Sequence, residues 1–421
     1  MKDYVKIQPF DCMQYFYGKI QDPLIKCMID LGGFLDEKKI KETVIELINS
    51  IPLLKCRFDI KKHRWQKENF SIDDYFEIVE DKNSDAELRG HFMMTFINID
   101  KEAPLKIFLI RSGSYDSLCI IISHMICDGA GFKQLIYLLS DIYSGRKIEN
   151  PQIIKNRKFS QVTADFRFLK KLKIFSLKFK PIIQTPEMFF PLSGKNETAY
   201  IVKTEIKEED FLVIINFAKI YGVTVNDMIL AAYARALCKT LNIRKIVLPC
   251  FVDLRKYIKS GRMCGICNLT SQYLCEITFD RKDDFQKTLG IISDEMRKNK
   301  NSDNCLKGPM LLNAVFKILP FSFIRKNFLK ISPIPVTCYT NIGILDKEKL
   351  KFDDNEIKSA YFGTSVRKQP YFQISVSTYS EVLYLTSSFY GIADDKIKVL
   401  KLMEDLKNEL IIGAANNTKA I

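Results

Sequence analysis

A histidine, an aspartate and a glycine lie close together in the stretch SHMICDG, residues 123–129. His124 follows a run of apolar residues, Asp128 comes four residues later, and Gly129 comes directly after it. A neutral imidazole has a pKa near 6.5, so His124 is suited to take a proton from a reacting group at neutral pH. The same pair of residue types would also suit a metal site, and a histidine beside an apolar strand is often a core residue without a chemical role.

The rest of the sequence gives little support for a metal site. Histidine occurs only three times, and neither His63 nor His91 belongs to a recognisable pair of ligands. Cys264 and Cys267 form a single CxxC, with no second pair at the spacing that zinc sites use. We therefore expect no bound metal.

The elements around the motif favour a catalytic role. Apolar runs over 104–111 and 117–123 predict two strands joined by a Gly/Ser turn, and the second strand leads directly into His124. The following stretch, AGFKQLIYLLSDIYSG, has the apolar spacing of a helix. Gly129 and Gly131 allow a sharp turn between strand and helix. A histidine at such a strand end can project into a cleft.

A serine–histidine–aspartate triad is disfavoured because adjacent strand residues point to opposite faces and no G-x-S-x-G stretch occurs.

Strand and helix patterns alternate through both halves of the chain. Residues 36–50 predict an amphipathic helix with Asp36 as its N-cap, and Thr224 with Asp227 predicts a capping box before another helix. Further helices are expected around 283–298, 310–330 and 394–410, and strands over 336–345, 371–380 and 383–391. We predict an α/β (α+β) fold with an N-terminal lobe over 1–150, a crossover segment over 151–198 and a C-terminal lobe over 199–421.

Composition and charge set the class of protein. The 421 residues are 47% hydrophobic and carry a net charge of +14, which fits a globular chain. No apolar run is long enough for a membrane span, and the N-terminus does not read as a signal peptide. Twelve scattered cysteines are expected to be free buried thiols, so we expect a cytoplasmic protein. Much of the positive charge lies in the basic stretch 157–180, where five phenylalanines are interleaved with lysine and arginine.

Five stretches, in order along the chain, match a known superfamily. HMICDG fits its HxxxDG motif, LDEKKIKETVIELINSIPLLKCRF its opening helix and strand, GVTVNDMILAAYARAL a central helix, PCFVDLRKY a segment that supplies an arginine, and YTNIG an Asn–Gly motif. The chain resembles the chloramphenicol acetyltransferase-like superfamily, which includes alcohol O-acetyltransferases, plant BAHD acyltransferases and condensation domains of nonribosomal peptide synthetases. Ser123 replaces the first of the two histidines usual in condensation domains, and YTNIGIL stands where the plant branch has DFGWG. These departures favour stand-alone enzymes similar to bacterial alcohol acetyltransferases.

The resemblance implies two lobes, each a mixed sheet with flanking helices, and a tunnel between them. It implies that His124 is the general base of an acyl transfer, that Asp128, Gly129 and Arg255 support the site, and that Asp128 pairs with Arg255. Contacts with the substrate or the oxyanion are expected from Tyr339, Thr340, Asn341 and Gln373. The acyl group would pass directly from acyl-CoA, a co-substrate rather than a bound cofactor, to a hydroxyl or amine of a small or lipid-like acceptor.

Two alternatives to this function stay open. One is a stand-alone condensation-type enzyme that takes its acyl group from an acyl carrier protein. The other is a non-catalytic basic protein that binds a membrane or nucleic acid, which the intact HxxxDG motif disfavours; we expect no nucleic-acid partner. The basic stretch would meet the phosphates of CoA or an acidic carrier protein, form a solvated surface, or make peripheral membrane contact.

Overall fold

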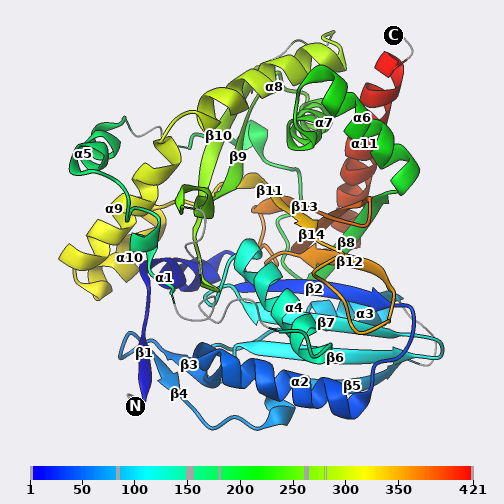
Figure 1. Cartoon of the computed structure of the whole chain (residues 1–421). Coiled ribbons are helices and arrows are strands. Elements are labelled where there is room, and N and C mark those ends of the chain that lie inside the picture. The colour runs from blue at the N-terminus through cyan, green and yellow to red at the C-terminus, as the bar shows by residue number, and fades with distance from the viewer. Residues whose placement is uncertain are drawn as a thin grey trace.

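A computed structural model describes residues 3–81, 86–147, 156–178, 182–259, 265–278, 280 and 282–418. The chain folds into two lobes, each built on one large β-sheet, and Figure 1 shows the lobes one above the other. The two lobes keep largely separate apolar cores.

The N-terminal sheet has five strands in the order β12–β2–β7–β6–β5. Their bounds are β2 Leu24–Leu31, β5 Phe76–Asp81, β6 Leu105–Ser112, β7 Asp116–Ser123 and β12 Ile357–Gly363. Neighbours are antiparallel except β5 and β6, which are parallel. Helices α2 (Glu37–Ser50) and α4 (Gly129–Tyr143) pack on one face, and α3 (Ala86–Met93) contacts β7 on the other. Every residue of β7 is buried, so the strand that leads to His124 is held on both faces.

A local sequence signal marks the first long helix of the N-terminal lobe. The helix expected over 36–50 is α2, and the Asp36 carboxylate accepts the backbone N–H of Lys39 at 2.7 Å. This bond satisfies a donor that the first turn of a helix leaves free. Near the N-terminus, a small three-stranded sheet is formed by β1 (Tyr4–Lys6), β4 (Arg64–Lys67) and β3 (Cys56–Asp59).

The C-terminal sheet has six strands in the order β10–β9–β11–β13–β14–β8. Their bounds are β8 Thr198–Ile206, β9 Lys245–Asp253, β10 Thr270–Thr278, β11 Thr337–Leu345, β13 Phe372–Tyr379 and β14 Val382–Gly391. It is flanked by α6 Glu208–Tyr221, α7 Val225–Leu241, α8 Phe285–Lys300 and α11 Ala393–Thr418. Thr224 and Asp227 form the predicted capping box at the start of α7. Most of α7 is buried in the core of this lobe.

Some predicted elements differ from the structure. The helical region expected over 310–330 is two helices, α9 (Asn304–Ile318) and α10 (Phe321–Ile331). The chain turns at Pro320, whose extended backbone and missing N–H end one helix and precede the next. The last helix, expected over 394–410, continues to Thr418. Helices α1 (Pro9–Phe16) and α3 and strands β1, β2, β5 and β12 were not predicted.

Strand β12 links the lobes, because it belongs to the C-terminal part of the chain but pairs with β2 in the N-terminal sheet. Its seven residues alternate poorly between polar and apolar, so their pattern alone does not mark a strand. The domain bounds given above remain a prediction.

The crossover segment contains a short helix, α5 (Phe168–Ser176), which Figure 1 shows at the outer edge of the molecule near α9. The eleven cysteines that the structure describes are buried and form no disulfide with one another, as expected, and Cys264 lies outside the described residues. Among the described helices none alone could cross a membrane; the pair α6 and α7, bent by 108°, meets the length and composition criteria only jointly.

Candidate active site

The loop between β7 and α4 carries the HxxxDG residues. The backbone N–H of His124 donates to the carbonyl of Pro23 at 2.7 Å, which fixes the start of the loop. Asp128 is the N-cap of α4 and accepts the N–H of Gly131 at 2.9 Å. A Cβ on Gly131 would lie 2.8 Å from the Cβ of Cys127 and 3.1 Å from the carbonyl of Cys267. Only glycine fits this close approach between the lobes.

Asp128 holds the two lobes together at the site. Its Oδ2 accepts from Arg255 Nη1 at 3.0 Å, from the N–H of Leu269 at 2.7 Å and from Thr270 Oγ1 at 2.9 Å. Burial alone would raise the pKa of Asp128, but Arg255 and the backbone donors hold this pKa below its usual value of 3.8. Asp128 is therefore a charged structural group with no free oxygen for proton transfer.

Asn268 sets the orientation of His124. Its Nδ2 donates to the carbonyls of His124 at 2.9 Å and of Met125 at 3.2 Å. The amide oxygen therefore faces Nδ1 of His124, at 3.2 Å. An oxygen can only accept, so Nδ1 carries the proton of the neutral imidazole and Nε2 has the free lone pair. This tautomer is the one that a general base needs.

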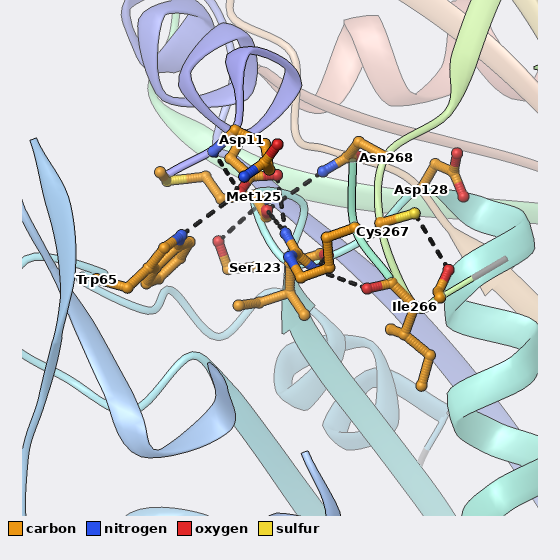
Figure 2. Close-up of polar contacts among 12 residues, drawn as sticks. Asp11, Trp65, Ser123, Met125, Asp128, Ile266, Cys267 and Asn268 are labelled. Carbon is orange, nitrogen blue, oxygen red and sulfur yellow. Dashed lines mark hydrogen bonds and ion pairs between the residues drawn. The ribbon is translucent and has the colours of Figure 1, made fainter. Parts of the chain in front are cut away.

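A buried ion pair supports the same loop from the other side. Arg157 donates to Asp11 Oδ1 at 2.8 Å and to the carbonyls of Ile126 at 2.5 Å and Ile266 at 2.6 Å. Figure 2 shows Asp11 from α1, Met125 from the loop and the segment 266–268 converging there. Arg157 was expected to belong to a basic surface, but only 13% of its side chain is exposed and its hydrogen bonds are to the protein.

A cavity of about 1070 Å³ lies between the lobes, and His124 and Gly129 form part of its wall. Of the four residues predicted to contact substrate or oxyanion, Thr340, Asn341 and Gln373 line this cavity with His124. Tyr339 does not, because its side chain is buried in the C-terminal core and its hydroxyl donates to Asn226 at 3.0 Å. Neighbouring strand residues point to opposite faces of a strand, so the side chain of Tyr339 points away from that of Thr340.

Asn341 and Gln373 are held by the protein. Asn341 Nδ2 donates to Asn226 Oδ1 at 3.0 Å, and Asn341 Oδ1 accepts the N–H of Gly343 at 2.8 Å. The Oε1 of Gln373 accepts from Arg367, a residue that also lines the cavity. Both amides therefore have fixed orientations, and each amide nitrogen still has a proton to donate.

The pH dependence of activity follows from the surroundings of His124. Burial lowers the pKa of the imidazole below 6.5 and the charge of Arg367 acts in the same direction, while Asp128 and Asn268 oppose them. The imidazole is therefore neutral, and able to accept a proton, above a pKa that lies below 6.5. We expect kcat/KM to rise with pH along a limb centred below 6.5 and to be level above it. A limb centred at or above pH 6.5 would contradict this environment.

The same shift has a consequence for stability. The unfolded chain, with a histidine pKa near 6.5, binds this proton more readily than the folded protein. The contribution of His124 to the free energy of unfolding is therefore complete above pH 6.5 and is lost as the pH falls from 6.5 towards the folded-state pKa.

Solved structures with this architecture cover almost the whole chain. Polyketide synthase associated protein 5 from Mycobacterium tuberculosis aligns with a TM-score of 0.66 and 13% identity, over 97% of each chain. The trichothecene 15-O-acetyltransferase of Fusarium sporotrichioides aligns with a TM-score of 0.66 and 13% identity, over 98% of this chain and 95% of that one. The first condensation domain of the calcium-dependent antibiotic synthetase aligns with a TM-score of 0.64 and 12% identity, over 98% of this chain and 96% of that one. This chain has the condensation-domain fold.

The condensation-domain fold confirms the two-lobed α/β architecture that the motifs predicted. No family model and no curated protein matches the sequence. At these identities the likeness shows the fold alone, so the chemistry has to be argued from the site.

Sequence reasoning missed several residues of the site. Asn268, Arg157 and Arg367 lie far from His124 in sequence, and no local pattern marks them. The side chains that α1 adds to the cavity, Phe10, Met13 and Gln14, were missed together with the helix itself. PFDCMQYF does place Pro at the start of a helix and an acidic residue in its first turn, which are signals of a helix N-terminus.

Proposed function

We propose that this protein transfers an acyl group from a thioester to a hydroxyl or amine, with His124 as the general base. The observation that carries this proposal is the imidazole whose Nδ1 faces the amide oxygen of Asn268, in the wall of a large cavity between the lobes. Such an imidazole is neutral and oriented, which is the state that proton abstraction requires.

The reaction balances without a covalent enzyme intermediate. Nε2 of His124 accepts the proton of the acceptor O–H or N–H as that oxygen or nitrogen attacks the thioester carbonyl. The C–S bond of the resulting tetrahedral intermediate then breaks, and the leaving thiolate takes the proton back from the imidazolium. Thr340, Asn341 and Gln373 supply hydrogen-bond donors in the cavity wall for the oxyanion or the acceptor.

The donor that we propose is acyl-CoA. A second cavity, of about 1080 Å³, adjoins the first and shares Gln21, Phe328 and Lys330 with it. The lining of this second cavity includes five lysine and arginine residues but only two aspartates: Lys19, Arg325, Lys326, Lys330 and Lys368 against Asp22 and Asp100. A thioester carrier with phosphate groups fits such a surface, because opposite charges attract. The phosphopantetheine arm of an acyl carrier protein has the same chemistry and is the alternative.

Helix α5 supports a lipid-like acceptor or peripheral membrane contact. Phe168 is 72% exposed and Leu169 is 77% exposed, next to Lys170 and Lys171. Apolar side chains beside lysines are typical of helices that lie on an anionic membrane surface. The end of the basic stretch, residues 179–180, lies outside the described residues. A cytoplasmic location remains our proposal for the protein.

Thiol release tests the proposed reaction. We expect a short-chain acyl-CoA and a panel of alcohols and amines to give one free thiol for each ester or amide formed, measured with a chromogenic disulfide. The His124→Ala variant provides the blank for spontaneous hydrolysis. If acyl-CoA is inert with every acceptor while an acyl carrier protein donor is consumed, the condensation-type function replaces this one. If neither donor reacts, the non-catalytic alternative is left.

A further inference from the structure

Arg367 is a buried arginine in the wall of the cavity that holds His124. It lies in the segment between β12 and β13, is 4% exposed, and is fixed by backbone hydrogen bonds to Ser388 at 3.0 Å and Tyr390 at 2.7 Å. These bonds tie the segment to β14, so the side chain starts from a rigid position.

The guanidinium of Arg367 has no carboxylate partner among the described residues. Its Nη2 donates to Gln373 Oε1 and to Cys338 Sγ at 3.6 Å, while Nε and Nη1 are buried without any partner. The nearby carboxylate of Asp22 is already used, because it accepts from Lys26 Nζ at 2.9 Å and from the N–H of Val366 at 2.8 Å.

Two other arginines near the site, both only slightly exposed, have carboxylate partners. Arg157 pairs with Asp11 at 2.8 Å, and Arg255 pairs with Asp128 at 3.0 Å. A buried charge without a counter-ion is strongly unfavourable, and proteins normally pair it. Arg367 is the exception among these three, and it is the one of the three that lines the cavity.

The wall around Arg367 has further unused polar atoms. The Oγ1 of Thr364 and the Oε1 of Gln21 are buried without a hydrogen-bond partner, and both residues line the same cavity. The hydroxyl of Thr364 is free to donate, and the unused N–H groups of Arg367, at Nε and Nη1, can each donate a charge-assisted hydrogen bond to a carboxylate oxygen.

We propose that Arg367 binds a carboxylate carried by one of the two substrates, close to the reacting carbonyl. This inference rests on the proposed function for the identity of the ligand as a substrate. The phosphates of CoA are separated from its thioester by the whole pantetheine arm. Arg367 lines the same cavity as His124 and its charge acts on that imidazole, so the guanidinium is expected to meet the acyl group or the acceptor rather than those phosphates. The enzyme would select a hydroxy or amino acid as acceptor, or a dicarboxylic acyl group as donor.

Ligand-dependent thermal stability tests the carboxylate site without any turnover. The probes are butyrate and its neutral isostere butyramide, added to the wild-type protein, to Arg367→Gln and to the matched control Arg157→Gln. We expect saturating butyrate to raise Tm by about 1–3 °C in the wild type and in Arg157→Gln, because a ligand of the folded state stabilises it. Butyramide should leave Tm unchanged, and butyrate should have no effect on Arg367→Gln.

The unliganded Tm values separate a binding role from a structural role. Arg157→Gln leaves Asp11 buried without its partner, so its Tm should fall. Arg367→Gln removes an unpaired buried charge, so its Tm should equal or exceed the wild-type value. A fall of similar size in both variants, or equal responses of the wild type to butyrate and butyramide, overturns the proposal. The second comparison needs no variant, so it holds even if Arg367→Gln fails to fold.

Activity assays then identify the substrate that carries the carboxylate. One arm compares 3-hydroxybutyrate with its methyl ester as acceptors for acetyl-CoA, and the other compares succinyl-CoA with butyryl-CoA as donors to a neutral alcohol. Arg367→Gln should lower kcat/KM by at least 10-fold for the acid of one pair and leave its neutral partner within about 2-fold. If neutral and acidic substrates lose activity equally, Arg367 does not bind a carboxylate. If no arm shows turnover but butyrate still raises Tm of the wild type, the result counts against acyl transfer and not against the carboxylate site at Arg367.

Discussion

Replacing His124 with alanine is expected to lower kcat by about 10²- to 10⁴-fold while the protein stays folded. The imidazole is the one titratable side chain of the HxxxDG loop with a free lone pair towards the cavity, because Asp128 uses both oxygens for the protein. The measurement is thiol release under saturating donor and acceptor, with circular dichroism and Tm to show that the fold is retained.

His91→Ala is the matched control, since it removes an exposed imidazole from α3 in the same lobe. This variant should keep wild-type kcat. Asn268→Asp is a useful companion, because a carboxylate facing Nδ1 would raise the pKa of His124 and move the acidic limb of the pH profile upward. A near-normal rate for His124→Ala would remove the residue from the mechanism.

Replacing Asp128 with asparagine is expected to lower the free energy of unfolding by about 3–5 kcal/mol, because it breaks a buried ion pair on one side only. The side chain of Arg255 is 9% exposed and would lose its main counter-ion. The amide also cannot satisfy the site: its NH₂ group would face either the N–H of Gly131 or the three donors at Oδ2. Urea denaturation measures the loss.

A double-mutant cycle of Asp128→Asn with Arg255→Ala isolates the interaction energy between these two side chains from the effects of their other contacts. We expect a coupling energy of about 1–3 kcal/mol, since residues in direct contact are non-additive. The exposed pair Lys38 and Glu42 on α2, 4.0 Å apart, is the control and should couple by less than 1 kcal/mol. Additive effects of Asp128→Asn and Arg255→Ala would mean that the bridge contributes nothing to stability.

Sequence patterns predicted the elements and residues whose signals are local. The α2 helix has its own N-cap and apolar stripe, so it was predicted with nearly correct bounds, and the capping box of α7 marked where that helix begins. The HxxxDG loop was placed correctly between a buried strand and a helix for the same reason. These segments carry their structural information within one or two turns of chain.

The errors concern residues whose roles depend on distant partners. Tyr339 lies in a motif next to Thr340, but the two faces of β11 send one side chain to the core and the other to the cavity. Arg157 counts as surface charge in the sequence because nothing there shows that it meets Asp11, 146 residues away. Arg367 carries no local pattern at all, since its lack of a counter-ion is visible only in three dimensions.

The pairing of β12 with β2 affects how the chain folds during its synthesis on the ribosome. Gly363 follows Leu31 by 332 residues, so at 5–20 residues per second the partner strand emerges from the ribosome roughly 20–70 s after β2. Until then β2 is an edge strand with unpaired backbone groups and an apolar sequence, the combination that promotes association with other chains. The nascent N-terminal half is therefore the aggregation-prone stage of this protein's synthesis, and chaperone binding is expected to fall between the completion of β7 and the arrival of β12.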